Sequence, residues 1–409
     1  MTTTSPPWLK QLKLLAIAGV CVLACGMIVA QVGMRNVSMD RRWFDVNDRI
    51  WSNLLIATFY LLTVGLGGAV FLALTYVSGA GWHAAFRRVP ETMAKTIPWS
   101  GLAILLVLGL GIGRYGWHHH GDGDAGTFWF KEMWLTPSFW FTRAVAYVVI
   151  WSLLARWLVN RRQRPADIER TGSNDVGVAA AFLAVYAVTF SLASVDWMMA
   201  LEPMWFSTMW GVYNFAGMIQ AALATVVILC LLSRSPGRAL AGLFSDEHLH
   251  DLGKLLLGFS CFWMYIWFSQ YMLIWYSNIP EETSYFISRM HGPWGPLVVV
   301  SIVMNWVVPF FVLLPKPAKR NAGIMMRVAV VMLAGRWVDL YVMVMPSISR
   351  KTADGSELVF PSPVVGLWEV AALACLIGAG GWLLFRTLAR AVPVPRNDPY
   401  LAESLHYHA

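Results

Sequence analysis

Ten long apolar stretches run through this chain of 409 residues. Each approaches or exceeds the roughly 20 residues that an α-helix needs to cross the hydrocarbon core of a bilayer. Hydrophobic residues make up 57% of the chain and charged residues 13%, so no soluble domain is left over. The sequence therefore predicts an all-α integral membrane protein with ten transmembrane helices. We place the spans at residues 14–33, 51–78, 97–115, 139–158, 176–197, 206–232, 253–277, 295–315, 323–345 and 364–386.

An internal repeat organises these spans. Spans 2 to 5 and spans 6 to 9 each begin with a long helix that carries aromatic residues and glycine, Trp51 to Val77 and Phe206 to Leu232. Because four spans is an even number, both units have the same orientation in the membrane. We expect two four-helix bundles, with one flanking helix at each end of the chain. The segments are then 1–50 (N-terminus, first helix and outer loop), 51–197 (first bundle), 198–345 (second bundle), 346–390 (outer loop and last helix) and 391–409 (tail).

Basic residues indicate the orientation. With the N-terminus inside, 20 of the 31 Lys and Arg residues fall on inner segments and nine on outer loops. An excess of Lys and Arg marks the cytoplasmic side of a membrane protein. The sequence therefore predicts that both termini are cytoplasmic. The net charge of +8 is accounted for by this topology and by anionic phospholipid, and we predict no nucleic-acid partner.

The N-terminus leaves one alternative open. Lys10 and Lys13 precede an apolar run that contains Leu23-Ala24-Cys25-Gly26, a pattern similar to a lipoprotein signal. The run stays apolar as far as Val32, so an uncleaved first span is the favoured interpretation.

Histidine and cysteine usage bears on cofactors. All nine histidines fall outside the predicted spans, so no helix pair can hold a haem between two imidazoles. The five cysteines all lie within apolar spans and form no CxxC or iron–sulfur motif. His118, His119 and His120 lie on a Gly-rich loop, where adjacent histidines are more often solvated than metal-bound. We therefore expect no metal and no covalently bound cofactor in this chain.

Few charges lie inside the spans. They are Arg143, Arg336 and Asp339, with Asp196 and Glu369 near span ends. An unpaired charge in hydrocarbon costs several kcal/mol, so such residues usually serve a function or pair with each other. Arg336 and Asp339 are three residues apart and share one helix face. They are interpreted either as a structural ion pair or as groups that take part in chemistry.

Four strings of sequence carry a family resemblance. They are SVDWMMALEPMWFST (194–208), DLGKLL (251–256), WYSNIPEET (275–283) and GRWVDLY (335–341). In this order they resemble the polysulfide-reductase-like (NrfD-like) membrane subunits of alternative complex III, a bacterial quinol:cytochrome c oxidoreductase. The likeness covers most of residues 50–390. The length and short tail are more similar to the smaller, ActF-type subunit than to the larger, ActC-type one.

The resemblance implies a place in a multi-subunit complex of the bacterial inner membrane. Its expected partners are a larger, ActC-like membrane homologue, periplasmic iron–sulfur and c-type haem subunits, phospholipids and a terminal oxidase or cytochrome c. Electrons pass from quinol or menaquinol through the periplasmic subunits, and this chain supports quinol oxidation and proton transfer. A quinol pocket is predicted near the outer ends of the spans, with Arg143, Trp197, Tyr276 and His291 as its candidate residues.

Proton transfer needs a chain of exchangeable groups. Asp196, Asp339 and Arg336 are the main candidates. On span 5, Tyr186 and Thr189 fall close to the helix face of Asp196, as a relay or as polar contacts between helices.

Glu281 has two interpretations. It lies three residues after Asn278, with Pro280 between them, which is the spacing of a capping box at a helix start. Proton chemistry is the alternative.

Two other classes of function remain open. A structural anchor for periplasmic redox subunits needs no quinone site of its own. A secondary transporter also has many spans, buried charges and repeats, but proline is scarce inside the spans and an even-numbered repeat lacks inverted topology.

The topology yields a direct test. In a variant without native cysteines, single cysteines in the 116–138 and 278–294 loops should react with a membrane-impermeant thiol reagent in intact cells. Cysteines at either terminus or in the 161–170 loop should be protected, because the positive-inside rule places them in the cytoplasm. Labelling of the 161–170 loop from outside would contradict the predicted orientation.

Overall fold

The fold is known from a computed structural model, and its long elements are all helical. It describes residues 7–33, 46–115, 117, 133–161, 171–202, 204–234, 240–290, 292–348, 351–353, 356–359, 365–390 and 400–407. Within these ranges, ten helices are long and apolar enough to cross a membrane. The prediction of ten apolar spans is therefore confirmed for length and composition. Two short antiparallel strands, β1 (Lys351–Ala353) and β2 (Ser356–Val359), precede the last span.

Eight of the spans contain one long helix each, and two are interrupted. The long helices are α1 (Pro7–Gly33), α2 (Val46–Val77), α4 (Ile97–Gly111), α6 (Pro137–Arg161), α7 (Thr171–Trp197), α8 (Trp210–Ser233), α9 (Asp246–Ser277) and α14 (Ala322–Ile348). The eighth span is α11 (Gly295–Ile302), a π-helical turn η7 (Val303–Val307) and α12 (Val308–Leu313). The tenth is α15 (Leu367–Cys375), a second π-helical turn η8 (Leu376–Gly380) and α16 (Gly381–Arg390).

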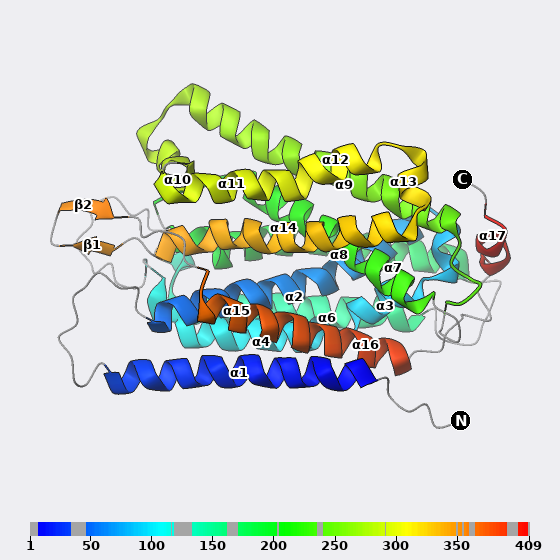
Figure 1. The fold of residues 1–409 in the computed structure, drawn as a ribbon, viewed down its shortest axis with the longest axis horizontal. Helices are drawn as coiled ribbons and strands as arrows, with labels where there is room; N and C mark the ends of the chain where they lie inside the picture. The colour runs from blue at the N-terminus through cyan, green and yellow to red at the C-terminus, as the bar shows by residue number, and fades with distance from the viewer. Residues whose placement is uncertain are drawn as a thin grey trace.

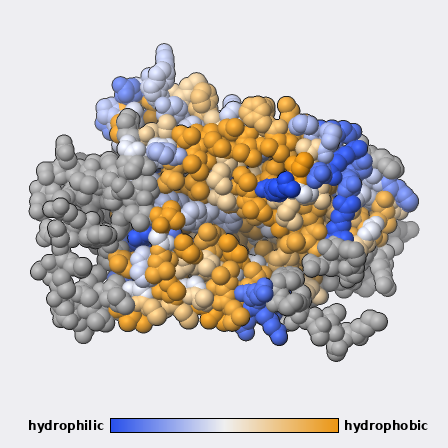
Figure 2. Space-filling model, viewed as in Figure 1, coloured by the Kyte–Doolittle hydropathy of each residue, from blue (hydrophilic) through white to orange (hydrophobic). Residues whose placement is uncertain are grey.

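Short helices cap the two ends of the molecule. Figure 1 places the start of α1 together with α3 (Arg88–Ala94), α13 (Lys316–Arg320) and α17 (Leu401–Leu405) at one end, which we call the terminal side. It places α10 (Pro280–Met290) and the two strands at the other end, the opposite side. Figure 2 shows apolar side chains over the middle of the visible face and hydrophilic ones toward both ends, most densely at the terminal side. This pattern is typical of a membrane protein.

We describe the long helices in two groups, which we call the first half and the second half. In the first half, α2 and α6 each pack against α4 and α7. In the second half, α8 packs against α9 and α14, and the interrupted eighth span contacts both of these. The most buried spans, α2 and α8, pack against each other and join the halves.

The first and last spans pack together, which the sequence did not predict. Figure 1 shows α1 beside α15 and α16 on one flank of the molecule. Glycines permit the approach, because a Cβ at Gly19 would lie 2.7 Å from the carbonyl oxygen of Ala371. Glu369 then fixes α15 to α2: Arg49 donates to both carboxylate oxygens, at 2.6 and 2.5 Å, and Asn53 donates at 3.0 Å. Glu369 is therefore a structural charge near a span end.

The start of α9 differs from the predicted boundary. The span was expected to begin at residue 253, but α9 begins at Asp246 because Ser245 caps it. The backbone N–H of Ser245 donates to Nδ1 of His248 at 3.0 Å, and the Ser245 side chain accepts from the His248 N–H. His248 and His250 therefore lie on a spanning helix, at its terminal-side end, rather than outside the spans.

Close contact between the halves can be tested at Gly67. A Cβ at this position on α2 would overlap the Cβ of Ala222 on α8. We predict that Gly67→Ala lowers the stability of the purified protein by about 1–3 kcal/mol, because the added methyl cannot be accommodated without backbone shifts. Thermal denaturation followed by size-exclusion chromatography measures the effect. Gly258→Ala on α9 is the matched control, since nothing lies within 4 Å of its added methyl; equal behaviour of both variants would contradict the packing.

Candidate functional site

The central polar group of the second half lies on α14. Arg336 Nη1 donates to Asp339 Oδ2 at 2.5 Å, and the two residues are only 1% and 4% exposed. Arg336 and Asp339 therefore share one helix face, as predicted, and form an ion pair that is buried among the helices. A buried pair of this kind is neutral as a unit, but each partner depends on the other.

Helix α8 completes this group. The Tyr213 hydroxyl donates to Asp339 Oδ1 through a very short hydrogen bond, and Arg336 Nη2 donates to Asn214 Oδ1 at 3.2 Å. A Cβ at Gly217 would overlap the guanidinium of Arg336, so this glycine makes the space for it. We call Tyr213, Asn214, Arg336 and Asp339 the Asp339 cluster. Every polar group in it comes from α8 or α14.

A small cavity adjoins the Asp339 cluster. Its polar lining comes from Tyr213, Asp339, Tyr285, Arg289 and Ser301, and apolar side chains complete it. Its volume of about 30 Å³ suits one or two water molecules. Pockets for small organic ligands are roughly 300 Å³ or larger, so the cavity does not fit a quinone ring.

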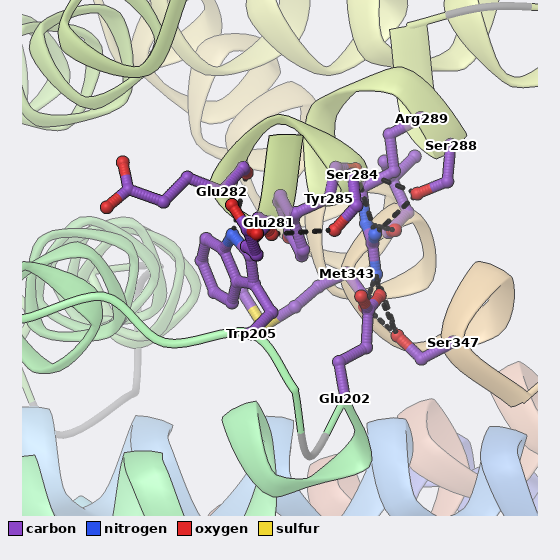
Figure 3. A network of polar contacts seen from close by, with 11 residues as sticks. Glu202, Trp205, Glu281, Glu282, Ser284, Tyr285, Ser288, Arg289, Met343 and Ser347 are labelled. Carbon is purple, nitrogen blue, oxygen red and sulfur yellow. Dashed lines mark hydrogen bonds and ion pairs between the residues drawn. The ribbon is translucent and has the colours of Figure 1, made fainter. Parts of the chain in front are cut away.

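A second ion pair lies on the far side of this cavity, toward the opposite side of the molecule. Arg289 on α10 contacts Glu202 at 2.8 Å, and Ser347 donates to the same carboxylate oxygen at 2.8 Å (Figure 3). Arg289 is 2% exposed and Glu202 is 7% exposed. Glu202 belongs to the connector between α7 and α8, so the pair ties this connector to α10 and α14.

Arg289 also donates hydrogen bonds to neighbouring backbone. Its Nε donates to the Val342 carbonyl at 3.0 Å and its Nη2 to the Met343 carbonyl at 2.8 Å. Tyr285 lies beneath the guanidinium, with its ring centroid 3.6 Å from Cζ, and Trp205 stacks on Tyr285 at 4.2 Å. Burial raises the pKa of Tyr285, so its hydroxyl stays protonated at physiological pH. We call Arg289, Glu202, Ser347 and Tyr285 the Arg289 cluster.

The π-helical turn in the eighth span contributes a third polar group. It frees the carbonyl of Asn305, which accepts from Gln220 Nε2 at 2.6 Å and from Ser260 Oγ at 2.7 Å. The Asn305 amide donates to the carbonyl of Ser301, a residue that also lines the cavity, at 2.9 Å. The four helices of the second half therefore all supply polar atoms to its interior.

Of the buried side-chain atoms in this interior that have no hydrogen-bond partner among the described residues, three belong to residues named above. They are Arg336 Nε, Asn305 Oδ1 and Gln220 Oε1. Buried polar atoms without a protein partner usually bond to internal water. The second half thus contains a run of polar groups that water can connect.

Asp196 in the first half has a different environment. Arg143 donates to both of its carboxylate oxygens, at 3.1 and 3.0 Å, and Trp134 and Tyr147 each add a hydrogen bond, at 2.8 and 3.1 Å. Asp196 is 1% exposed, and Arg143 also lies over the Trp134 ring at 3.9 Å. All four bonds hold the carboxylate in place. The arrangement is typical of a structural lock between α6 and α7.

Tyr186 and Thr189 do not continue from Asp196 as a row of hydrogen bonds. The Tyr186 hydroxyl donates to the Met218 sulfur at 2.9 Å, across the boundary between the halves. Thr189 donates to the carbonyl of Val185 at 2.7 Å and accepts from Trp151 at 2.8 Å. These contacts favour the interpretation of both residues as polar contacts between helices.

The remaining candidate residues lie apart from one another. Trp197 is fully buried between Tyr147 and Trp151, whereas Tyr276 is 84% exposed at the end of α9 that lies on the opposite side of the molecule. Among the described residues, no contact joins Tyr276 to Arg143 or Trp197. His291 and the His118–His120 tract lie outside the described residues.

Asn278 ends one helix and does not cap the next. It closes α9 in the left-handed conformation, with φ 49° and ψ 38°, and its N–H donates to the Ile274 carbonyl. Glu281 is exposed in the first turn of α10. The proposed capping box with Asn278 is therefore wrong, because Asn278 supplies the bend between α9 and α10.

Sequence reasoning missed most partners of the buried charges. Tyr213, Asn214 and Gln220 were not singled out because they lie in a strongly apolar span. An amide side chain in such a span is itself a sign that polar groups pack between helices. Glu202 is in one of the family-like strings, yet it was not singled out. Arg289 was assigned to an outer loop because α10 is too short and too polar to be read as a span.

The described residues show no metal centre. No group of three or more His, Cys, Asp or Glu side chains converges among them. The five cysteines, which are all described, form no disulfide.

Comparison with protein-family models and with curated proteins finds no match to this chain. The family resemblance therefore rests on the four sequence strings alone. What it implies about activity and partners is taken up below as a proposal.

The ion pair on α14 can be tested by single and double replacement. Arg336→Leu or Asp339→Leu alone should lower stability by about 3–5 kcal/mol, because the remaining charge is buried and unpaired. The double variant should recover most of the loss, measured as the melting temperature of the purified protein. In the double variant the Tyr213 hydroxyl has lost Asp339 as its acceptor. Adding Tyr213→Phe removes this donor. If the double variant were as unstable as the single variants, the loss of stability would not come from an unpaired buried charge.

Proposed function

We propose that this chain is a membrane subunit, without a redox centre of its own, of an alternative complex III type quinol:cytochrome c oxidoreductase. The ordered family-like strings support this assignment, and the ten apolar helices are compatible with it. The partners would be a larger ActC-like homologue and periplasmic iron–sulfur and haem subunits. The terminal side would face the cytoplasm, since the basic residues favour that orientation.

The proposal includes two four-helix bundles of the same orientation. The first would be spans 2 to 5 and the second spans 6 to 9. Packing of α2 and α6 against both α4 and α7 supports the first bundle. Packing of α8 against α9 and α14, closed by the eighth span, supports the second.

Within this complex, we assign proton movement to the second half. The observation that carries the assignment is the cavity of about 30 Å³ between the Asp339 cluster and Arg289. Tyr213 both donates to Asp339 and lines this cavity. Rotation of its hydroxyl would pass a proton between cavity water and Asp339 Oδ1. The other members of the route would be Ser301 and the amides of Asn305 and Gln220, on the terminal side of the cavity.

Arg336 would keep this route neutral overall. A carboxylate in hydrocarbon without a partner would take up a proton and keep it. The guanidinium 2.5 Å away stabilises the ionised form of Asp339, so that a proton can leave again. Arg336 is thus a positioning residue, and Asp339 and Tyr213 are the groups that exchange protons.

Quinol oxidation is proposed to take place outside this cavity. The cavity is too small for a quinone ring, and Tyr276 is not gathered with Arg143 and Trp197. The exposed aromatic end of α9, with Trp275 66% and Tyr276 84% exposed, leaves room for quinol or lipid at a subunit boundary. This chain would then support oxidation by moving protons and by holding its partners.

A structural anchor is the second candidate. The Asp196 carboxylate is saturated with donors, and Arg289 uses its donors on backbone and side chains around it. Such saturated clusters are what a rigid membrane anchor needs. This function would leave the cavity beside Asp339 without a role.

Removal of one hydroxyl separates the two candidates. Tyr213→Phe deletes the exchangeable group beside Asp339, so in the assembled complex we expect quinol:cytochrome c turnover or its proton release to fall roughly tenfold or more. Tyr186→Phe is the matched control. It also removes a buried tyrosine hydroxyl, but one that donates only to a thioether. Full turnover and full proton release in assembled Tyr213→Phe complex would leave the chain an anchor.

A further inference from the structure

The connector between α7 and α8 exposes two large apolar side chains. Met204 is 79% exposed and Phe206 is 68% exposed. Residues 204–209 form turns and non-helical backbone, since α8 begins only at Trp210. An irregular backbone is not found exposed to lipid within the hydrocarbon core, because its polar groups need water. Met204 and Phe206 therefore lie beyond the hydrocarbon core, on the opposite side of the molecule.

The connector is held firmly beneath these two side chains. Trp205, which stands between them in the chain, is 4% exposed and donates through Nε1 to the carbonyl of Glu282 on α10 at 3.0 Å (Figure 3). Its ring also stacks on Tyr285. Ser207 accepts from Gln270 Nε2 on α9 at 2.9 Å. The connector is thus anchored on both α9 and α10, and a surface that is already ordered loses little conformational entropy when it binds a partner.

Acidic side chains border the exposed apolar pair. Glu281 and Glu282 lie in the first turn of α10, the turn to which the connector is bonded. Glu281 is exposed and Glu282 is half-buried, and neither carboxylate has an ion-pair partner among the described residues. Ile279, just before this turn, is 43% exposed. We call Met204, Phe206, Ile279, Glu281 and Glu282 the docking face.

The composition of the docking face favours a protein as its occupant. Met and aromatic residues are enriched at the centre of protein interfaces, and charged residues lie at the rim. Two carboxylates do not attract the anionic phosphate of a lipid headgroup. A symmetric pair of copies of this chain would bring the same acidic residues together, which like-charge repulsion opposes. A basic rim on a different protein is the complementary surface.

We propose that the docking face binds a water-soluble protein that presents a basic side chain beside an apolar surface. The inference rests on the proposed function, which supplies this partner as a periplasmic redox subunit. Met204 and Phe206 would pack against the partner's apolar surface. Glu281 and Glu282 would pair with its Lys or Arg residues at the rim.

Photo-crosslinking in intact cells tests the docking face in the full chain. With a benzophenone amino acid in place of Phe206, we expect a covalent adduct with a protein that carries haem or an iron–sulfur cluster, identified by mass spectrometry and metal content. Phe311 is the matched control position, because it is 65% exposed but lies on the spanning helix α12. It should react only with lipid or membrane subunits. Adducts of position 206 with phospholipid alone, or with a second copy of this chain, would overturn the proposal.

The same experiment separates this inference from the proposed function. If iron–sulfur and haem subunits co-purify with the chain but position 206 reacts with none of them, the docking face is wrong and the proposed function stands. If position 206 reacts with one identified water-soluble protein that has no redox centre, the docking face stands and the proposed function is wrong.

Charge reversal tests the chemistry of the partner. Glu281→Lys combined with Glu282→Lys should lower the adduct yield at position 206 about threefold or more, because rim charges steer association with a partner of opposite sign. Glu403→Lys on α17 is the matched control, since it reverses an exposed acidic residue at the terminal side and should leave the yield unchanged. An unchanged yield in the double variant would contradict a basic partner.

Discussion

A charged side chain buried among membrane-spanning helices needs an oppositely charged partner. This constraint determines how the second half is built. Arg336 requires Asp339, and together they require the hydroxyl of Tyr213, the amide of Asn214 and the space that Gly217 provides. Because these groups come from α8 and α14, the pair fixes the rotation of both helices. The same constraint leaves room for water beside Asp339, which a wholly apolar interior would exclude.

The connector between the halves shows the constraint a second time. Asp196, on α7 just before the connector, is held by Arg143 of the first half, and Glu202, within the connector, is held by Arg289 of the second half. One family-like string therefore contains both acidic residues, and each arginine comes from a different half. A comparable contact lies on the terminal side, where Ser404 near the C-terminus donates to the carbonyl of Trp82 in the first half and pairs with His248 in the second half. The molecule is thus tied at both ends, with the α2–α8 contact between them.

The sequence was sufficient for features that depend on length and period. Ten apolar stretches predicted ten helices, and the spacing of Arg336 and Asp339 predicted a shared face. It was insufficient for contacts between distant segments, because hydropathy does not say which helix faces which. The partners Tyr213 and Arg289, the pairing of α1 with α15, and the seat of Ser404 all depend on tertiary packing. The start of α9 was missed because a polar cap at Ser245 extends the helix beyond its apolar residues.

We propose that the interior of the second half holds water for proton transfer and does not hold quinol. A density map of the assembled complex with a quinol-site inhibitor bound tests this most directly. We predict ordered water between Tyr213, Asp339 and Arg289, and inhibitor density outside this chain's cavity. Inhibitor density between Tyr213 and Arg289, or a cavity closed by apolar side chains, would contradict it.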